Sequence, residues 1–357
     1  MYDIITFGSA TKDIILKSKA FKVTKDLPAQ AGDKDFVTGE GICLSLGSKI
    51  DVEDIKFNSG GGGTNTTATF AKQGFKTAFC GVVGDDEAGK EIIDELKRLK
   101  VETSLVSKTK EKVTNYSVII SSEGDLPAQA GDRTILAYRG ASDVLDKDNI
   151  PWNKLKTKWI YLAPLSGLLC LPAGRQATTP FEDIVNFAFE NKIRIAVNPG
   201  NYQLSYPLEK LEAIFKKIDI LFLNQEEASF LTKISFHEEP EIFKKIDQMC
   251  PGVAVMTKDI DGVVVSDGTY IYSAKPHQEL KVIDATGAGD AFASGFLSDY
   301  IRHNGDIEKA IQLGIANAEG CLSEIGAKNG LLDKNSQFER VEVKKQLCSE
   351  NNLCRIK

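Results

Sequence analysis

The sequence VIDATGAGDAFASGFL, residues 282–297, places two glycines and several small residues between two aspartates, directly before a helical pattern. Gly287 and Gly289 can adopt backbone angles that are closed to other residues, so successive amides can point into one concavity. A helix that begins near Ala288 adds free N–H groups and the positive end of its dipole. The stretch therefore predicts an anion site of the kind that suits a phosphoryl group.

Asp290 lies in the first turn of this predicted helix, where the helix dipole favours an ionised carboxylate. Such a carboxylate can accept a proton from an attacking hydroxyl group. In phosphoryl transfer, however, positioning and charge stabilisation contribute more to the rate than a base does. A capped helix start with a packing glycine is the simple structural alternative, and the stretch alone leaves both open.

The composition is that of a globular protein, with 357 residues, 42% hydrophobic and 26% charged. This length suits one large α/β domain, alone or with a smaller appendage. A net charge of −6 and the absence of long Lys/Arg runs argue against a nucleic-acid partner. Because no run of 18 apolar residues and no signal-peptide layout is found, we expect a cytoplasmic protein without a membrane partner.

Metal-ligating patterns are missing from the sequence. The seven cysteines form no CxxC pair, and the three histidines form no HExxH motif. Residues 84–91, GDDEAGKE, imitate a phosphate-binding P-loop, but Glu91 replaces the hydroxyl residue that would bind magnesium. No GxGxxG follows the first predicted strand. We therefore expect neither a zinc site nor a dinucleotide-binding site.

Apolar runs alternate with amphipathic stretches along most of the chain. Buried strands are expected at 3–9, 76–84, 158–164, 193–200, 219–224 and 252–258. Helices are expected at 64–74, 86–100, 181–192, 208–217, 225–232, 288–301 and 307–323. Residues 262–274 resemble a hairpin with a turn at Asp267-Gly268. This alternation predicts an α/β fold with a mainly parallel sheet covered on both faces.

Two segments, about 14–56 and 113–139, contain strand and turn patterns without a helix. They predict a small β-rich lid at the edge of a main domain that spans 1–340, with a C-terminal tail at 341–357. Such lids often close over a ligand.

A sequence that occurs twice interrupts both of these segments, and a related sequence lies outside them. DLPAQAGD occurs at 26–33 and again at 125–132, and the related LPAGRQA occurs at 171–177. Proline and glycine already mark turns there, and surface loops tolerate insertions. We therefore interpret 27–33, 126–132 and 171–177 as inserts that lengthen loops without entering the active site, with a binding role as the alternative.

Other candidate binding residues lie at strand ends and helix starts. A second glycine run, 60–63, precedes a helix in which Asn65 can reach a hydroxyl group, and Asp13 follows the first strand. A flexible linker and an exposed loop acid are the structural alternatives. Asn224 and Glu227 form either a helix capping box or a ligand site at the carboxyl end of a strand.

Both glycine runs belong to longer motifs. Residues 60–103 resemble the N-terminal signature of the ribokinase-like (PfkB) carbohydrate kinases, and residues 282–297 closely resemble their second signature, D-T-T-G-A-G-D-x-F. The resemblance covers the chain apart from the repeats. It implies a three-layer α/β/α ribokinase-like fold with a β lid. It also implies transfer of the ATP γ-phosphate to a hydroxymethyl group of a sugar or nucleoside.

The resemblance also implies a role for each matching position. It makes Asp290 the catalytic base, with an anion hole at Gly287, Ala288 and Gly289. The positions that match sugar contacts are Asp13, Gly61, Gly62 and Asn65. The positions linked to ATP are Asn224, Glu227, Thr257, Gly262 and Asn317, the last beside the adenine. Glu227 is linked indirectly to Mg²⁺, and Asp284 matches a monovalent-cation position, which makes K⁺ a candidate cofactor.

Two positions depart from the family pattern. The T-x-G-x-x-G motif over the nucleotide is TKDIDG here, so Asp259 replaces its first glycine; this carboxylate either weakens ATP binding or points outward. Ala163 stands where ribokinases carry a ribose-binding glutamate, which argues against ribose itself.

We therefore expect an ATP- and Mg²⁺-dependent sugar kinase. A nucleoside kinase is the first alternative, and it would need an aromatic or apolar lid pocket, for which the lid segments offer Phe21, Phe36, Tyr116 and Tyr138. A non-catalytic sugar- or nucleotide-binding relative is the second. The resemblance further suggests a homodimer formed through the lid, with a monomer as the alternative if the repeats disturb that edge.

Overall fold

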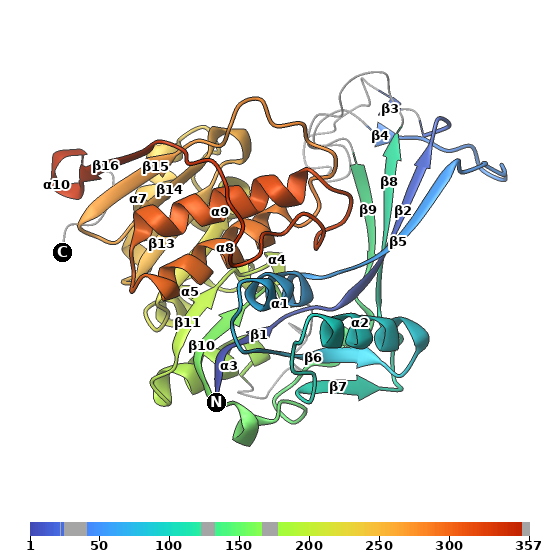
Figure 1. Cartoon of the computed structure of the whole chain (residues 1–357), viewed down its shortest axis with the longest axis horizontal. Helices are drawn as coiled ribbons and strands as arrows, with labels where there is room; N and C mark the ends of the chain where they lie inside the picture. Colours follow the sequence, from blue (N-terminus) through green and yellow to red (C-terminus); the bar gives the residue numbers. More distant parts are fainter. Residues whose placement is uncertain (22, 25–40, 123–132, 166–177, 352–357) are drawn as a thin grey trace.

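The computed structural model describes residues 1–21, 23–24, 41–122, 133–165 and 178–351 (Figure 1). Its main sheet has ten strands. In spatial order they are β16 (Val343–Leu347), β15 (Tyr270–Ala274), β14 (Val263–Ser266), β13 (Val253–Thr257), β12 (Ile220–Asn224), β11 (Arg194–Val197), β10 (Thr157–Leu162), β1 (Tyr2–Phe7), β6 (Thr77–Gly84) and β7 (Val106–Thr109).

The sheet is parallel from β13 to β7 and antiparallel from β13 to β16, which confirms the mainly parallel sheet predicted from the alternation of strands and helices. The predicted hairpin is β14 and β15, whose turn contains Gly268 at φ 79°. The stretch interpreted as a C-terminal tail contributes β16, which pairs with β15 at the sheet edge.

Successive residues of a strand point to opposite faces of a sheet, and the buried residues divide accordingly. Ile4 and Phe222 belong to the core on one face, and Ile5 and Leu223 to the core on the other. The first core is covered by α1 (Gly62–Lys72), α8 (Ala288–Arg302) and α9 (Ile307–Leu322). The second is covered by α3 (Pro180–Glu190), α5 (Leu208–Phe215), α6 (Gln225–Thr232) and α7 (Glu239–Met249).

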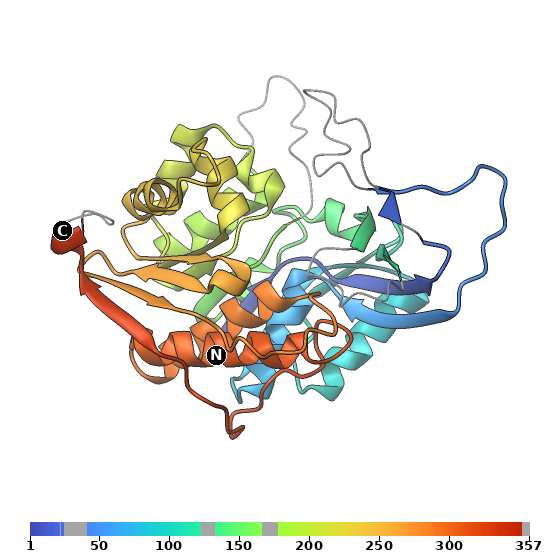
Figure 2. The same ribbon diagram turned by 90° about the horizontal axis from the view of Figure 1, so that it is seen from above.

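Figure 2 shows these two helical layers on either side of the sheet, so the molecule has the expected three-layer α/β/α arrangement. Helix α2 (Glu87–Arg98) packs on β6 through a smaller apolar cluster. The remaining short elements are β3 (Val23–Thr24), β4 (Gly41–Ile42), α4 (Asn201–Leu204), α10 (Cys348–Asn351) and the 3₁₀ turns Gly140–Val144, Trp152–Lys154 and Asp259–Asp261. Among the residues described, no helix is long and apolar enough to cross a membrane.

A separate four-stranded sheet lies beside the main one, in the order β5 (Asp54–Gly60), β2 (Thr11–Ser18), β8 (Asn115–Ser122) and β9 (Arg133–Tyr138) (Figure 1). β8 and β9 lie within the expected lid segment 113–139, whereas β2 and β5 overlap the two ends of the segment 14–56 and extend beyond it. The chain passes directly from β1 into β2 and from β5 into α1, so this sheet joins the main domain next to the glycine run. The three repeats lie outside the described residues.

Candidate active site

Gly287 caps the start of helix α8 and lies in the left-handed region at φ 81°. A Cβ added there would lie 2.4 Å from the Cβ of Ala327, so the position accommodates only glycine. By contrast, a Cβ added to Gly289 would meet no heavy atom within 4 Å. The space beside Gly289 in the first turn of α8 is therefore open, while the N–H of Ala288 donates to the carbonyl oxygen of Ala285 at 3.5 Å. The anion site stays a prediction.

The two glycine-led helices meet at Asp290. Its Oδ2 accepts a hydrogen bond of 2.9 Å from Nδ2 of Asn65, in the first turn of α1. A Cβ added to Gly62 would lie 3.3 Å from Oδ1 of the same carboxylate. The structure thus brings together three residues that were predicted separately. Gly62 and Asn65 were predicted to contact the acceptor, and Asp290 was predicted to be the base.

Burial raises the pKa of Asp290, because desolvation disfavours the charged form. The hydrogen bond from Asn65 and the positive charge of Lys328 both oppose this increase. The carboxylate therefore lies in a poorly solvated position where two specific groups favour its ionised state.

Asp13 lies on β2, and its side chain is buried against the glycine run. A Cβ added to Gly60 would lie 1.9 Å from Oδ2 of Asp13, so only a glycine lets the carboxylate approach this closely. Gly61 has φ 95°, and a Cβ there would lie 2.6 Å from the carbonyl oxygen of Ser9. Desolvation raises the pKa of Asp13 to about 6, and the charge of Lys328 opposes the increase.

Asp284 connects the start of α8 to the turn after α9. Its Oδ1 accepts hydrogen bonds from the backbone N and Oγ1 of Thr286, at 2.9 and 2.7 Å, and its Oδ2 accepts one of 2.9 Å from the N–H of Gly326. The proposed monovalent-cation role of Asp284 stays a prediction. Within the described ranges, no cluster of three or more His, Cys, Asp or Glu suitable for a metal ion is found.

Asn224 and Glu227 form the capping box of α6. The N–H of Glu227 donates to Oδ1 of Asn224 at 2.7 Å, and the N–H of Asn224 donates to Oε2 of Glu227 at 2.9 Å. The pair nevertheless stands at the carboxyl end of β12, so the structural role does not exclude the functional one. Desolvation, followed by the nearby charge of Asp290, raises the pKa of Glu227 to about 7.

Thr257 lies beside Asn224, because the two residues are partners in the register of β12 and β13. Gly262 follows the short 3₁₀ turn, and a Cβ there would lie 1.9 Å from the carbonyl oxygen of Ala274. Between them, exposed Asp259 has φ 46°, in the left-handed region that glycine favours. The backbone thus keeps the conformation of a glycine position despite the substitution.

Asn317 is fully buried between helices. Its Nδ2 donates to the carbonyl oxygen of Ala291 at 2.7 Å and to Oγ1 of Thr69 at 3.3 Å, and its Oδ1 accepts from the N–H of Leu332 at 2.9 Å. These contacts tie α9 to α8, to α1 and to the following loop. A position beside the adenine stays a prediction for this residue.

Sequence reasoning missed Lys328, which lies two residues after Gly326. Its side chain is only 7% exposed, and its Nζ donates a hydrogen bond of 2.6 Å to Oγ of Ser59. Nζ also lies 3.6 Å from Oε2 of Glu95. Nothing in the local sequence distinguishes this lysine from a surface lysine, because its partners come from distant segments.

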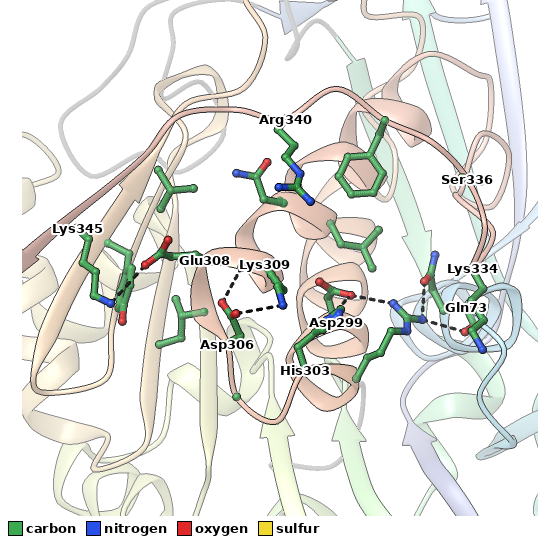
Figure 3. Close-up of a pocket in the computed structure, with 18 of the residues that line it drawn as sticks. Gln73, Asp299, His303, Asp306, Glu308, Lys309, Lys334, Ser336, Arg340 and Lys345 are labelled. Carbon is green, nitrogen blue, oxygen red and sulfur yellow. Dashed lines mark hydrogen bonds and ion pairs between the residues drawn. The ribbon is translucent and has the colours of Figure 1, made fainter.

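A groove with a volume of about 750 Å³ lies apart from these residues, along the end of α8, the start of α9 and the segment 333–345 (Figure 3). Ion pairs line it: Arg302 and Asp299 pair within α8 at 2.8 Å, and Lys345 of β16 pairs with Glu308 of α9 at 3.3 Å. None of the residues predicted for catalysis or binding lines this groove.

Comparisons with known proteins identify a family whose model matches most of the chain. Residues 36–335 match the pfkB family carbohydrate kinases. The chain is 26% identical over 265 residues to an uncharacterized sugar kinase of Archaeoglobus fulgidus, covering 73% of this chain and 97% of that protein. It is 23% identical over 301 residues to a nucleoside kinase of Methanocaldococcus jannaschii, covering 83% and 89%.

The crystal structure of a ribokinase from Thermotoga maritima has a similar fold, with a TM-score of 0.71. The two proteins are 20% identical, and the match covers 94% of this chain and 97% of that one. This likeness confirms the ribokinase-like α/β fold.

Proposed function

Because the chain belongs to the pfkB family of carbohydrate kinases, which are phosphotransferases with an alcohol acceptor, we propose that it phosphorylates a hydroxymethyl group of a sugar with ATP as the donor. The observation that carries this proposal is the hydrogen bond between Asn65 and Asp290, which unites the starts of α1 and α8. In this proposal the bond joins the acceptor side, at the start of α1, to the carboxylate and the backbone N–H groups at the start of α8.

Each group at this point has a chemical role in the proposal. Asp290 accepts the proton of the attacking hydroxyl group. The amides of Gly287, Ala288 and Gly289 stabilise negative charge on the transferred phosphoryl group. Asp13 accepts hydrogen bonds from other hydroxyl groups of the acceptor, and Asn65 orients Asp290.

The residues present also fit a magnesium ion bound indirectly through Glu227. Its carboxylate is half-buried, close to the negative charge of Asp290, and burial raises its pKa, so a nearby cation would stabilise its ionised form. Mg²⁺ bound with ATP supplies neutralisation of phosphate charge. Asn224 and Thr257, adjacent at the strand ends, are the proposed neighbours of the nucleotide phosphates.

A nucleoside acceptor receives less support from the described residues. Tyr116 and Tyr138 are register partners, and Tyr116 also pairs with Lys12, so all three share one face of the four-stranded sheet. Asp13 follows Lys12 and points to the opposite face. The two tyrosines therefore face away from the site, and Phe21 is buried; Phe36 lies outside the described residues. This arrangement favours a sugar.

The test is ADP release by the wild type and by Asp290→Asn with pentoses, hexoses, phosphosugars and nucleosides, with and without K⁺. We expect turnover of one or a few sugars and a decrease by orders of magnitude in the variant. Turnover of nucleosides alone would contradict the sugar as acceptor and support the nucleoside kinase instead. Full activity of a folded Asp290→Asn variant would contradict the role of this carboxylate.

We further propose that a second copy of the chain covers the outer face of the four-stranded sheet. The register places Phe57, Ile14, Val118 and Leu136 in one row across this face. Phe57 is 57% exposed and Leu136 56%, and such an apolar row is typical of an interaction surface. Sedimentation of the wild type should show a dimer, and Phe57→Glu should produce a monomer. A monomeric wild type would contradict the proposal.

A further inference from the structure

Lys328 is a buried lysine within the candidate active site, in the turn that follows α9. Its Nζ donates to Oγ of Ser59 at 2.6 Å and lies 3.6 Å from Oε2 of Glu95. Ser59 in turn donates its hydroxyl hydrogen to Glu95. This cluster connects three separate parts of the molecule, namely the turn after α9, strand β5 of the four-stranded sheet, and α2.

The cluster lies at the junction between β5 and α1. Ser59 directly precedes the glycine run, Asp13 packs against Gly60, and Asn65 in the first turn of α1 holds Asp290. A displacement of this junction would move the two carboxylates relative to each other. Lys328 therefore fastens the backbone segment on which the geometry of the acceptor site depends.

The ammonium group also acts on both carboxylates through its charge. Burial raises the pKa of Asp13 and of Asp290, and the charge of Lys328 opposes the increase at each of them. Burial lowers the pKa of Lys328 itself, and the charges of Glu95, Asp13 and Asp290 oppose this decrease by favouring the protonated ammonium. One buried cation thus interacts with three acidic groups from three different elements.

Other charged groups also act on these carboxylates, from neighbouring elements. Lys12 on β2 favours the ionised form of Asp13, but its ammonium is paired with Glu91 of α2. Asp284, before α8, raises the pKa of Asp13. Two titratable groups on other elements also interact with Asp290. Besides burial, its negative charge contributes to the raised pKa of Glu227 on α6 and of Tyr161 on β10.

We propose that Lys328 is a positioning residue for the acceptor, whose ammonium group fastens the β5–α1 junction and serves as the built-in counter-ion for Asp13 and Asp290. This inference rests on the function proposed above. Lys328 favours the ionised form of Asp290, which can take the hydroxyl proton, and the ionised form of Asp13, which accepts hydrogen bonds from the acceptor. Without it, two poorly solvated carboxylates would lack their shared cation.

The test compares Lys328→Met, Lys328→Arg and Ser59→Ala with the wild type. For Lys328→Met we expect the KM of the acceptor to rise about tenfold or more and the acidic limb of the kcat/KM profile to move up by about one pH unit, while the KM of ATP is unchanged. Lys328→Arg keeps the positive charge, so the acidic limb of its kcat/KM profile should lie at the same pH as in the wild type. Ser59→Ala should raise the acceptor KM without a pH shift.

Lys72→Met is the matched control. The ammonium of Lys72 also donates to the chain just beyond this turn, at 3.2 Å from the carbonyl oxygen of Leu331, but it contacts neither carboxylate. It should leave both the acceptor KM and the pH profile unchanged. An unshifted profile in folded Lys328→Met, or an equal loss in Lys72→Met, would overturn the assignment.

Failure of the proposed function is distinguishable from failure of this inference. If the wild type phosphorylates no acceptor, the proposed function is wrong. Amide hydrogen exchange of residues 59–65 then tests separately whether Lys328 fastens the β5–α1 junction. Faster exchange in Lys328→Met than in Lys72→Met would support the fastening role. Equal exchange rates would overturn it.

Discussion

Asn65 and Asp290 are 225 positions apart, yet the side-chain amide of the first donates a 2.9 Å hydrogen bond to the carboxylate of the second. Each lies in the first turn of a helix that follows a glycine with positive φ, 95° at Gly61 and 81° at Gly287. These two backbone turns let the helix starts approach each other. The bond therefore joins the two glycine motifs of the sequence into one site.

Replacing Asn65 by leucine should shift the pH dependence of the reaction. The amide favours the ionised form of Asp290, so its loss raises the pKa of that carboxylate further, and the acidic limb of kcat/KM moves to higher pH. Because hydrogen bonds to charged groups contribute about 1.5–3 kcal/mol, we expect a decrease of roughly 10- to 100-fold at neutral pH. Steady-state kinetics over a pH series measures both effects.

Thr67→Val is the control for this variant. The hydroxyl group of Thr67 bonds only within its own helix, to the carbonyl oxygen of Gly63 at 2.6 Å. Its loss should leave the pH profile in place. A profile of Asn65→Leu that coincides with that of the wild type would contradict the orienting role of the amide.

Asp13→Asn should stabilise the protein in a pH-dependent way while reducing its activity. The folded pKa is about 6, above the ordinary 3.8, so the folded state binds the proton more tightly than the unfolded state. Below about pH 4 both states are protonated and the substitution has little effect. As pH rises from about 4 to 6, the unfolding free energy of the wild type falls by roughly 3 kcal/mol. The asparagine variant has no titrating group at this position, so its unfolding free energy does not show this decrease.

Urea unfolding of both proteins near pH 4 and near pH 7.5 measures this difference. The gain in unfolding free energy should be present only at the higher pH. A gain of equal size at both values would show that the carboxylate is not responsible.

Gly287→Ala and Gly289→Ala should separate folding from function. At Gly287 the new methyl group would collide with Ala327 in a left-handed conformation, and we expect a loss of about 2 kcal/mol or more. At Gly289 nothing lies within 4 Å, and alanine is favoured in a helix by about 1 kcal/mol. The second variant should therefore be as stable as the wild type, but its methyl group would occupy the proposed phosphoryl site and lower kcat.

Thermal unfolding and ADP release of the two variants provide the measurement. A stable and fully active Gly289→Ala protein would place the phosphoryl group elsewhere.

Much of the fold could be predicted from the local sequence pattern. The hairpin turn at Asp267-Gly268 and the start of α8 at Gly287 follow from backbone preferences that act within a few residues. Helix α7 was not predicted, although Ile242, Ile246 and Met249 recur at helical spacing, because Pro240 in its first turn resembles a break in the chain. Strand β16 was missed as well, since its pairing with β15 is a long-range contact.

The candidate site likewise contains residues that the local sequence could predict and one that it could not. Asp13, Asn65 and Asp290 could be named because each stands next to a strand end or a glycine run, where ligands commonly bind. Lys328 could not be named, because its burial depends on Ser59 and Glu95, which the fold brings from elsewhere. Local signals therefore identify the residues that shape the backbone, and only the structure identifies the counter-ion.

Asp259→Gly should stabilise the protein and strengthen ATP binding. Asp259 has φ 46°, and a left-handed conformation costs a non-glycine residue about 1 kcal/mol, so glycine should raise the unfolding free energy by that amount. It also removes a negative charge from the side of the site proposed for the nucleotide. Thermal unfolding and calorimetric titration with ATP measure the two effects.

Asp261→Gly provides the matched control, since Asp261 ends the same 3₁₀ turn without a positive φ and pairs with Lys275 at 3.6 Å. It should gain no stability. Unchanged ATP affinity in Asp259→Gly would indicate that the exposed carboxylate points away from the nucleotide.

Excision of residues 126–132 should leave both fold and activity intact. Ser121 and Arg133 are partners in the antiparallel register of β8 and β9. After excision, residues 122–125 would connect them, and a loop of this length is common in hairpins. Thermal unfolding and ADP release by the shortened chain test this expectation, with a glycine–serine replacement of equal length as the control. Loss of activity in a folded, shortened protein that the replacement shares would assign the repeat a direct part in binding.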